Sequence, residues 1–196
     1  MLTISIRLIH CNPACSPGIR AGCGKTLFSM KTPFHPSSIR LIAGIGNPET
    51  KYANTYHNAG LQFLSFLSEE AKKGSSSLPL LFSSPVSMNL SGSPIQKVLA
   101  MRSISPRDML LVHDDSDLPL GKYRISFGSS SAGHRGAESV IEALGTNEFY
   151  RLRFGIRDPV FHHRKRAEHF VLHSISPEHA KALRKAFLSA SSIFLS

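Results

Sequence analysis

The sequence predicts an α/β fold: a single three-layer domain with a mixed, mostly parallel central sheet flanked by helices. Two short apolar runs, residues 41–47 and 109–112, have the composition of buried strands. Segments with helical periodicity separate and follow these runs, and strands that alternate with helices are typical of a largely parallel sheet. A chain of 196 residues fits one such domain and is long enough to bury a full core.

The first elements are expected to be the strand at 41–47, which Pro48 interrupts, and a helix after it. Apolar side chains recur at helical spacing at Leu61, Phe63, Leu64 and Leu67. This spacing predicts a helix from about His57 to Lys73, which Gly74 ends. Residues 78–86 hold a short apolar stretch that two prolines break, so the sequence predicts no regular element there.

A second helix is expected in the middle of the chain. Ser93 is a candidate N-cap, and Pro94 suits the first helical position. Ile95, Val98 and Leu99 share one helical face.

The second half of the chain continues the alternation of strands and helices. Its expected elements are the buried strand at 109–112, a turn at 117–121, a half-exposed strand at 122–127, a Gly/Ser-rich loop at 128–136, a helix at 137–144 that Gly145 stops, a strand at 151–156, and a last helix from Pro177 to about Ile193.

The composition indicates an anionic partner. The formal net charge is +10 and the sequence pI is about 9.9, which makes nucleic acid the leading expectation. Since no run of 18 apolar residues occurs, no membrane span is expected.

Residues 1–39 differ in composition from the rest of the chain, which we take as the domain, residues 40–196. Up to Arg40 there are five Lys or Arg and no Asp or Glu, and all three cysteines lie here. An acid-free leader with Arg and Ser is typical of an organelle transit peptide, which predicts a mitochondrial location. A disordered basic extension or an overlong gene model explains the leader equally well, and the protein is then expected in the cytoplasm. The cysteine spacing fits neither a zinc site nor a disulfide framework.

Polar side chains follow both predicted buried strands. His57 begins the helix after the first strand, and a carboxylate cluster (Asp114, Asp115 and Asp117) follows the second. The carboxyl ends of parallel strands meet at one edge of a sheet, so a histidine and a carboxylate there form a candidate base with its orienting partner. A histidine at a helix start is also often structural. No Ser or Cys lies in a nucleophile-elbow motif, so the base would act on water directly.

Other motifs in these segments allow more than one interpretation. Asn47 and Asn89 lie where an amide could donate to a developing oxyanion, although each alone is more often a turn former. The Gly44-x-Gly46 pair lacks the third glycine of a dinucleotide site. The run from Asp115 to Pro119 does not fit a calcium loop.

Five ordered motifs together resemble bacterial-type peptidyl-tRNA hydrolases. The family pattern G-L-G-N-P-G-x-x-Y-x-x-T-R-H-N-x-G appears here as Gly44-Ile45-Gly46-Asn47-Pro48-Glu49, Tyr52, and Thr55-Tyr56-His57-Asn58 with Gly60. The others are Ser87-Met88-Asn89-Leu90-Ser91-Gly92, His113-Asp114-Asp115-Ser116-Asp117-Leu118-Pro119-Leu120-Gly121, Gly133-His134-Arg135-Gly136, and Arg151-Leu152-Arg153-Phe154-Gly155-Ile156. The resemblance covers about residues 40–175.

The resemblance implies hydrolysis of the ester between a peptide and the 3′ end of tRNA, by a monomer that uses neither metal nor cofactor. It implies that His57 is the general base and that Asp114 orients it. Asn47 would hold His57 or the substrate end, and Asn89 would position the water and carbonyl. In the same way, Tyr52 and Arg135 would line the substrate site, and Arg124 and Arg153 would clamp tRNA phosphate.

The chain also departs from the family pattern. Arg135 stands where the family usually has Asn, and Ser87 replaces a usual Phe. The chain is shorter than usual near residues 74–87 and at the C-terminus, and a hairpin of two strands is expected to be largely missing. These departures support an alternative: a catalytically impaired tRNA- or RNA-binding relative, for example an organelle RNA-processing factor.

Overall fold

A five-stranded sheet forms the centre of the computed structural model, which describes residues 34–74, 77–158, 168 and 170–195. The strands are β1 (Leu41–Gly44), β2 (Leu80–Ser83), β3 (Met109–Pro119), β4 (Tyr123–Phe127) and β5 (Tyr150–Arg157). The helices are α1 (Ala59–Lys73), α2 (Gly92–Arg102), α3 (Arg135–Leu144) and α4 (Pro177–Leu195). The leader 1–39 lies outside the described residues except for its last six.

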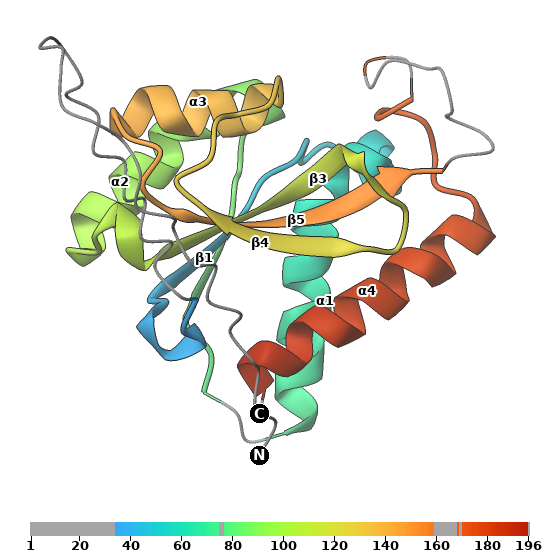
Figure 1. Cartoon of the computed structure of the whole chain (residues 1–196), viewed down its shortest axis with the longest axis horizontal. Coiled ribbons are helices and arrows are strands. Elements are labelled where there is room, and N and C mark those ends of the chain that lie inside the picture. The colour runs from blue at the N-terminus through green and yellow to red at the C-terminus, as the bar shows by residue number, and fades with distance from the viewer. Residues whose placement is uncertain (1–33, 75–76, 159–167, 169, 196) are drawn as a thin grey trace, which may run out of the picture. The chain divides into compact units, whose positions relative to one another are not determined.

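The sheet is mixed and mostly parallel, as the sequence predicts. Its strand order is β2-β1-β3-β5-β4, and only the β4–β5 pair is antiparallel. Helices α1 and α4 cover one face of the sheet, and α2 and α3 cover the other (Figure 1). The predicted three-layer α/β architecture is therefore confirmed. No helix in the described part of the chain is long and apolar enough to cross a membrane.

The strands differ from the sequence expectation in two places. Residues 80–83 form β2, an edge strand that pairs in parallel with β1, although no regular element was expected there. The backbone of this four-residue stretch is hydrogen-bonded to β1. A sequence pattern does not reveal such pairing between distant segments. β3 runs on to Pro119 rather than ending near Val112, because it keeps pairing with β5 across an irregularity between Asp115 and Pro119.

The predicted helices all form, with small changes at their ends. A 3-10 turn at Tyr56–Asn58 precedes α1, so the α-helix begins after His57. Ser93 is not the N-cap of α2. The helix begins at Gly92, two residues before the expected first position at Pro94, and Ser91 is its N-cap. α3 begins at Arg135 and ends at Gly145, whose φ of 65° is left-handed backbone that glycine adopts without strain.

Gly60 brings the start of α1 against the end of β1 and against β3. A Cβ atom there would lie 2.4 Å from the carbonyl oxygen of Val112 and 2.6 Å from that of Ile45. Only glycine permits such a close approach of helix to sheet. The turn that carries His57 is thereby held at the carboxyl end of β1, next to Val112 of β3.

Candidate active site

A cleft of about 640 Å³ opens at the carboxyl end of β1, next to the second half of β3. Three loops form its walls: one follows β1, one precedes α2, and one runs from β4 to α3. The lining of the cleft includes most of the side chains singled out from the sequence: Asn47, Tyr52, His57, Asn89, Asp114, Arg135 and Arg153. Arg124 is the one predicted site residue that does not line it.

His57 and Asp114 meet in this cleft, as predicted, although Asp114 lies within β3 rather than after it. His57 Nδ1 lies 2.9 Å from Asp114 Oδ1. Because a carboxylate can only accept, His57 carries its proton on Nδ1, which leaves Nε2 as the basic nitrogen. The carboxylate is buried, with 2% of the side chain exposed, while the His57 side chain is 17% exposed. The geometry is that of a histidine base with its orienting partner.

Opposing influences set the pKa of His57. Burial disfavours the imidazolium and acts to lower the pKa, but the charge of Asp114 and its hydrogen bond outweigh burial. The nearby Arg135 guanidinium works in the same direction as burial. The net effect raises the pKa of His57 above its ordinary value.

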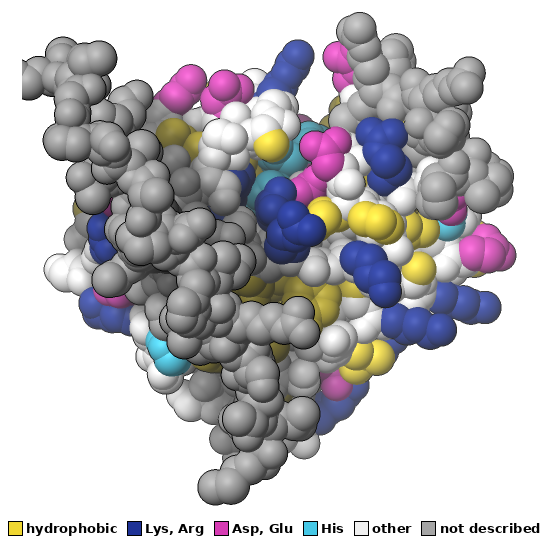
Figure 2. Space-filling model, viewed as in Figure 1, with side chains coloured by type: hydrophobic (Ala, Val, Ile, Leu, Met, Phe, Trp, Pro, Cys, Tyr) yellow, Lys and Arg dark blue, Asp and Glu magenta, His cyan; other side chains and the backbone are white. Residues whose placement is uncertain are grey.

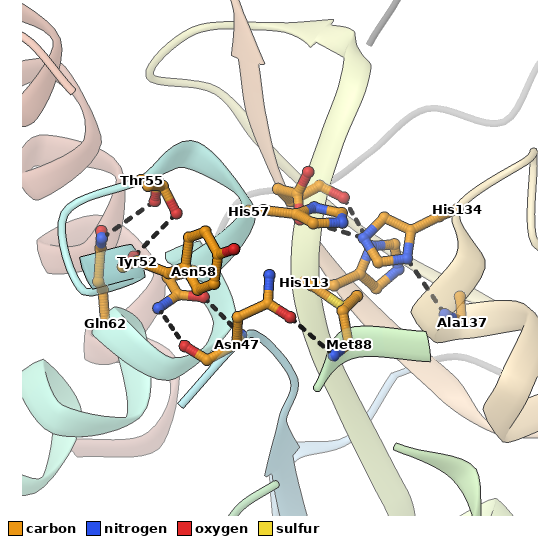
Figure 3. A network of polar contacts seen from close by, with 11 residues as sticks. Asn47, Tyr52, Thr55, His57, Asn58, Gln62, Met88, His113, His134 and Ala137 are labelled. Carbon is orange, nitrogen blue, oxygen red and sulfur yellow. Dashed lines mark hydrogen bonds and ion pairs between the residues drawn. The ribbon is translucent and has the colours of Figure 1, made fainter. Parts of the chain in front are cut away.

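His134 provides a second hydrogen bond to the same carboxylate. It is the N-cap of α3, where its Nδ1 accepts from the Ala137 amide at 3.1 Å. Its proton is therefore on Nε2, which lies 3.1 Å from Asp114 Oδ1 (Figure 3). Burial alone would raise the pKa of Asp114, but the two histidines hold it well below its usual range.

His113 contacts both His134 and Asp114. Its ring packs on that of His134 with centroids 4.3 Å apart, and its Nδ1 donates to the Asp114 carbonyl at 2.6 Å. Burial and the neighbouring His134 hold the pKa of His113 well below its usual range. His113 is thus a neutral packing partner rather than a second base.

Asn47 is held by two neighbours. Asn58 bonds both backbone groups of Asn47: its Oδ1 accepts from the Asn47 amide at 2.7 Å, and its Nδ2 donates to the Asn47 carbonyl at 2.9 Å. The Asn47 side-chain oxygen accepts from the Met88 amide at 3.0 Å. With that oxygen occupied, the Asn47 Nδ2 group points into the cleft (Figure 3). Asn47 makes no hydrogen bond to His57 among the described residues.

Three other predicted residues line the cleft around this centre. Tyr52 is half-buried, and Asn89 and Arg135 are exposed. Asn89 belongs to the 3-10 turn Met88–Leu90 that precedes α2, and Arg135 is the first residue of α3. Their polar ends are therefore accessible to a bound molecule.

Arg124 and Arg153 lie directly opposite each other on the antiparallel strands β4 and β5. Arg153 also bonds Asp115, with 2.6 Å between Nη1 and Oδ2, and it lines the cleft. Arg124 is exposed and lies outside the cleft lining. Figure 2 shows this face, where histidine side chains lie next to acidic and basic ones. The two arginines expected to act together are thus on the same face of the sheet.

The ligand atoms of His57, Asp114 and His134 lie within 4.8 Å of one another, which raises the question of a metal. Both ring nitrogens that face the carboxylate are at hydrogen-bond distance from it. The His134 nitrogen must carry its proton, because the other ring nitrogen accepts from Ala137. A metal ligand must give up that proton, so the donor set fits a hydrogen-bonded base better than a cation.

Sequence reasoning assigned no role to His134, Asn58 or Met88. The location of His134 just before the predicted helix at 137–144 could have indicated an N-cap. Its bond to Asp114 depends on the packing of α3 against the sheet, which no local pattern reveals. The backbone contacts of Asn58 and Met88 are likewise tertiary.

The fold and the cleft define a class: α/β enzymes whose acid–base group is a carboxylate-supported histidine. Within the described residues, no Ser or Cys side chain is hydrogen-bonded to His57. The chain belongs to the peptidyl-tRNA hydrolase family, because residues 41–195 match the model of that family. It is therefore a hydrolase of this type.

Individual relatives agree with this assignment. The peptidyl-tRNA hydrolase of Lactobacillus gasseri is 37% identical over 164 residues, which cover 76% of this chain and 87% of that protein. The peptidyl-tRNA hydrolase of Aquifex aeolicus is 35% identical over 170 residues, 78% of this chain and 86% of that protein. The crystal structure of peptidyl-tRNA hydrolase from Acinetobacter baumannii matches with a TM-score of 0.67 and 29% identity, covering 83% of this chain and 91% of that one.

Proposed function

We propose that this chain hydrolyses the ester bond of peptidyl-tRNA with water that the His57/Asp114 pair activates, and so recycles tRNA from stalled translation. The observation that carries the mechanism is the hydrogen bond from His57 Nδ1 to Asp114 Oδ1, which leaves His57 Nε2 free in the cleft. A base within reach of a bound water, and an ester that needs no protein nucleophile, are sufficient for this reaction.

The reaction has two steps. His57 Nε2 takes a proton from water while the water oxygen bonds to the ester carbonyl carbon, and the carbonyl oxygen becomes an oxyanion. The intermediate then releases the 3′ oxygen of the terminal ribose, which takes the proton from the His57 imidazolium. The products are a peptide acid and a tRNA. Asp114 stabilises the imidazolium between the steps.

Two amides are placed to assist the carbonyl. The Asn47 Nδ2 group faces the cleft because its oxygen is bonded to Met88, and Asn89 is exposed at its rim. An amide donor that becomes effective when the oxyanion forms lowers the barrier of acyl transfer. We assign substrate orientation to Asn47 and the positioning of water and carbonyl to Asn89.

The basic side chains in the cleft and next to it suit the tRNA acceptor stem and 3′ end. Arg124 and Arg153 form a cross-strand pair that can contact phosphate, and Arg135 lies nearer to His57. Phosphate contacts position a nucleic acid without reading its sequence. This fits an enzyme that must accept many tRNAs.

The experiment that tests this proposal is single-turnover release of N-acetylaminoacyl groups from tRNA by residues 38–196. His57→Ala should reduce the rate by about 10²- to 10⁴-fold, the usual contribution of a general base, while tRNA affinity changes little. Turnover retained in His57→Ala would refute the assignment of the base.

The alternative, a relative that binds RNA without cleaving it, predicts tRNA binding and no ester release by the folded protein. The assembled pair and the two amides in one cleft favour the enzyme. Arg135 and Ser87 remain the residues that favour the alternative, and both line the same cleft.

Location and assembly are also proposals. We propose import into mitochondria directed by residues 1–39, and a monomeric enzyme. A fusion of residues 1–40 to a fluorescent protein that stays diffuse in the cytosol would contradict the first. A molar mass near 43 kDa by light scattering, about twice the 21.5 kDa of the chain, would contradict the second.

A further inference from the structure

A second buried hydrogen-bond chain lies behind the site and takes no part in the proposed reaction. The Tyr56 hydroxyl is 2.6 Å from His179 Nδ1, and His179 Nε2 is 2.9 Å from Asp158 Oδ2. Tyr56 is 3% exposed and His179 is 7% exposed. Tyr56 lies in the turn before α1, His179 in the first turn of α4, and Asp158 directly after β5, so these hydrogen bonds join three parts of the fold.

The direction of this chain follows from its chemistry. The Asp158 carboxylate accepts, so His179 Nε2 carries a proton, and in neutral His179 Nδ1 accepts from the Tyr56 hydroxyl. Burial and the charge of Asp158 raise the pKa of Tyr56, which keeps the phenol protonated as a donor.

The same turn carries His57. Tyr56 and His57 are consecutive, and their side chains reach opposite ways, Tyr56 toward α4 and His57 toward Asp114. The His57 amide donates to the Val171 carbonyl at 2.9 Å, and Thr55 pairs with Ser174 in an isolated bridge. The segment that leads into α4 therefore holds the backbone of the turn. The hydrogen bond from the Tyr56 hydroxyl to His179 holds the same turn through a side chain.

We propose that Tyr56, His179 and Asp158 form a positioning strut that fixes the turn bearing His57, so that the imidazole stays aligned with Asp114. The family pattern quoted above has Arg where this chain has Tyr56, so the strut is not part of that pattern. The inference rests on the proposed function of His57 as the base. Tyr56 and His179 are positioning residues, because neither lines the cleft.

Tyr56→Phe is the first test, since it keeps the ring and its edge contact with Phe170 and removes only the hydroxyl. We expect kcat to fall about fivefold, in line with one net hydrogen bond, with KM for N-acetylaminoacyl-tRNA unchanged. The His57 ring signals, assigned by their loss in His57→Ala, should shift or broaden in spectra of ¹⁵N-histidine-labelled protein. Unchanged kcat and unchanged His57 signals would overturn the proposal.

Tyr123→Phe is the matched control. Its hydroxyl also contacts α4, at 3.4 Å from Ser189, but it comes from β4 and does not touch the turn of His57. It should leave kcat and the His57 signals as in the wild type. Equal effects of the two Tyr→Phe changes would mean that the loss of any tyrosine hydroxyl contact with α4 disturbs the enzyme. That result would contradict a specific role of the strut.

His179→Leu, alone and with Tyr56→Phe, tests whether the residues act as one unit. A single strut predicts that the double variant loses no more kcat than His179→Leu alone, whereas additive losses would overturn it. If the wild type binds tRNA but does not cleave it, the proposed function fails. The His57 signals then still decide whether the strut positions the ring.

Discussion

His57 and His134 donate to one and the same oxygen of Asp114, at 2.9 and 3.1 Å. One histidine has its second nitrogen in the cleft, while the second nitrogen of the other is bonded to the start of α3. The two rings therefore have different tasks. His57 can exchange a proton, and His134 can only hold the carboxylate in place.

Replacing Asp114 with Asn should separate the electrostatic role of the carboxylate from its shape. Neutral His57 is the active form, so activity rises with pH through the pKa of His57, which the carboxylate raises. In Asp114→Asn the carboxylate no longer raises the pKa of His57, whereas burial and Arg135 still act to lower it. The acid limb of the kcat/KM profile should move to lower pH, with kcat about 10²- to 10⁴-fold lower. A limb at its original pH would contradict the role of Asp114.

Changing His134 should affect stability in two separable ways. His134→Ala removes both the cap acceptor of α3 and the donor to Asp114, and about 2 to 4 kcal/mol of unfolding free energy should be lost. His134→Asn keeps an acceptor for the Ala137 amide but is too short to reach the carboxylate. Urea unfolding should rank the wild type above His134→Asn and His134→Asn above His134→Ala. Equal stability of the two variants would show that the cap contributes nothing.

Arg135 should influence both catalysis and binding through its charge. It acts to lower the pKa of His57, so Arg135→Asn should move the acid limb of the pH profile to higher pH. If Arg135 contacts phosphate, the slope of log affinity for tRNA against log salt should also shrink by about one. Arg102→Asn is a suitable control, since Arg102 is exposed at the end of α2 and does not line the cleft. A salt slope that changes equally in both variants would assign the effect to net charge alone.

Chelation tests the absence of a metal from the mechanism. With His57 and His134 hydrogen-bonded to Asp114, we expect EDTA-treated, desalted enzyme to retain its full rate in the single-turnover assay. A loss of rate that one divalent metal restores would replace the proposed base by a metal site at these three residues.

The sequence predicted the order of helices and strands well where the periodic pattern was long. α1 and α4 show it, because a helix that buries one face must repeat its apolar residues. β2 was missed because four residues between prolines carry no period, and their pairing with β1 is a tertiary event. The far end of β3 was missed for a similar reason: its polar residues look like a turn but continue to pair with β5.

The site was predictable to the extent that its residues follow buried strands or match the family motifs. His57 and Asp114 meet as expected, and Arg124 and Arg153 share a face. Asn47 was expected to hold His57 or the substrate end; its oxygen is bonded to the Met88 amide and not to His57, and the contact with substrate stays a prediction. The role of His134 depends on the contacts of both its ring nitrogens, one with Asp114 and one with the Ala137 amide. The contact with Asp114 is tertiary, so the sequence alone does not reveal it.

The link between Asn47 and the Met88 backbone has a consequence for how a substrate enters. It ties the loop after β1 to the turn before α2, so these two walls of the cleft can part only by breaking this hydrogen bond, at a cost of about 1 kcal/mol. A molecule that enters the cleft then meets two walls that are bonded to each other rather than two separate loops. Entry should be limited by diffusion and orientation rather than by a gating motion on this side.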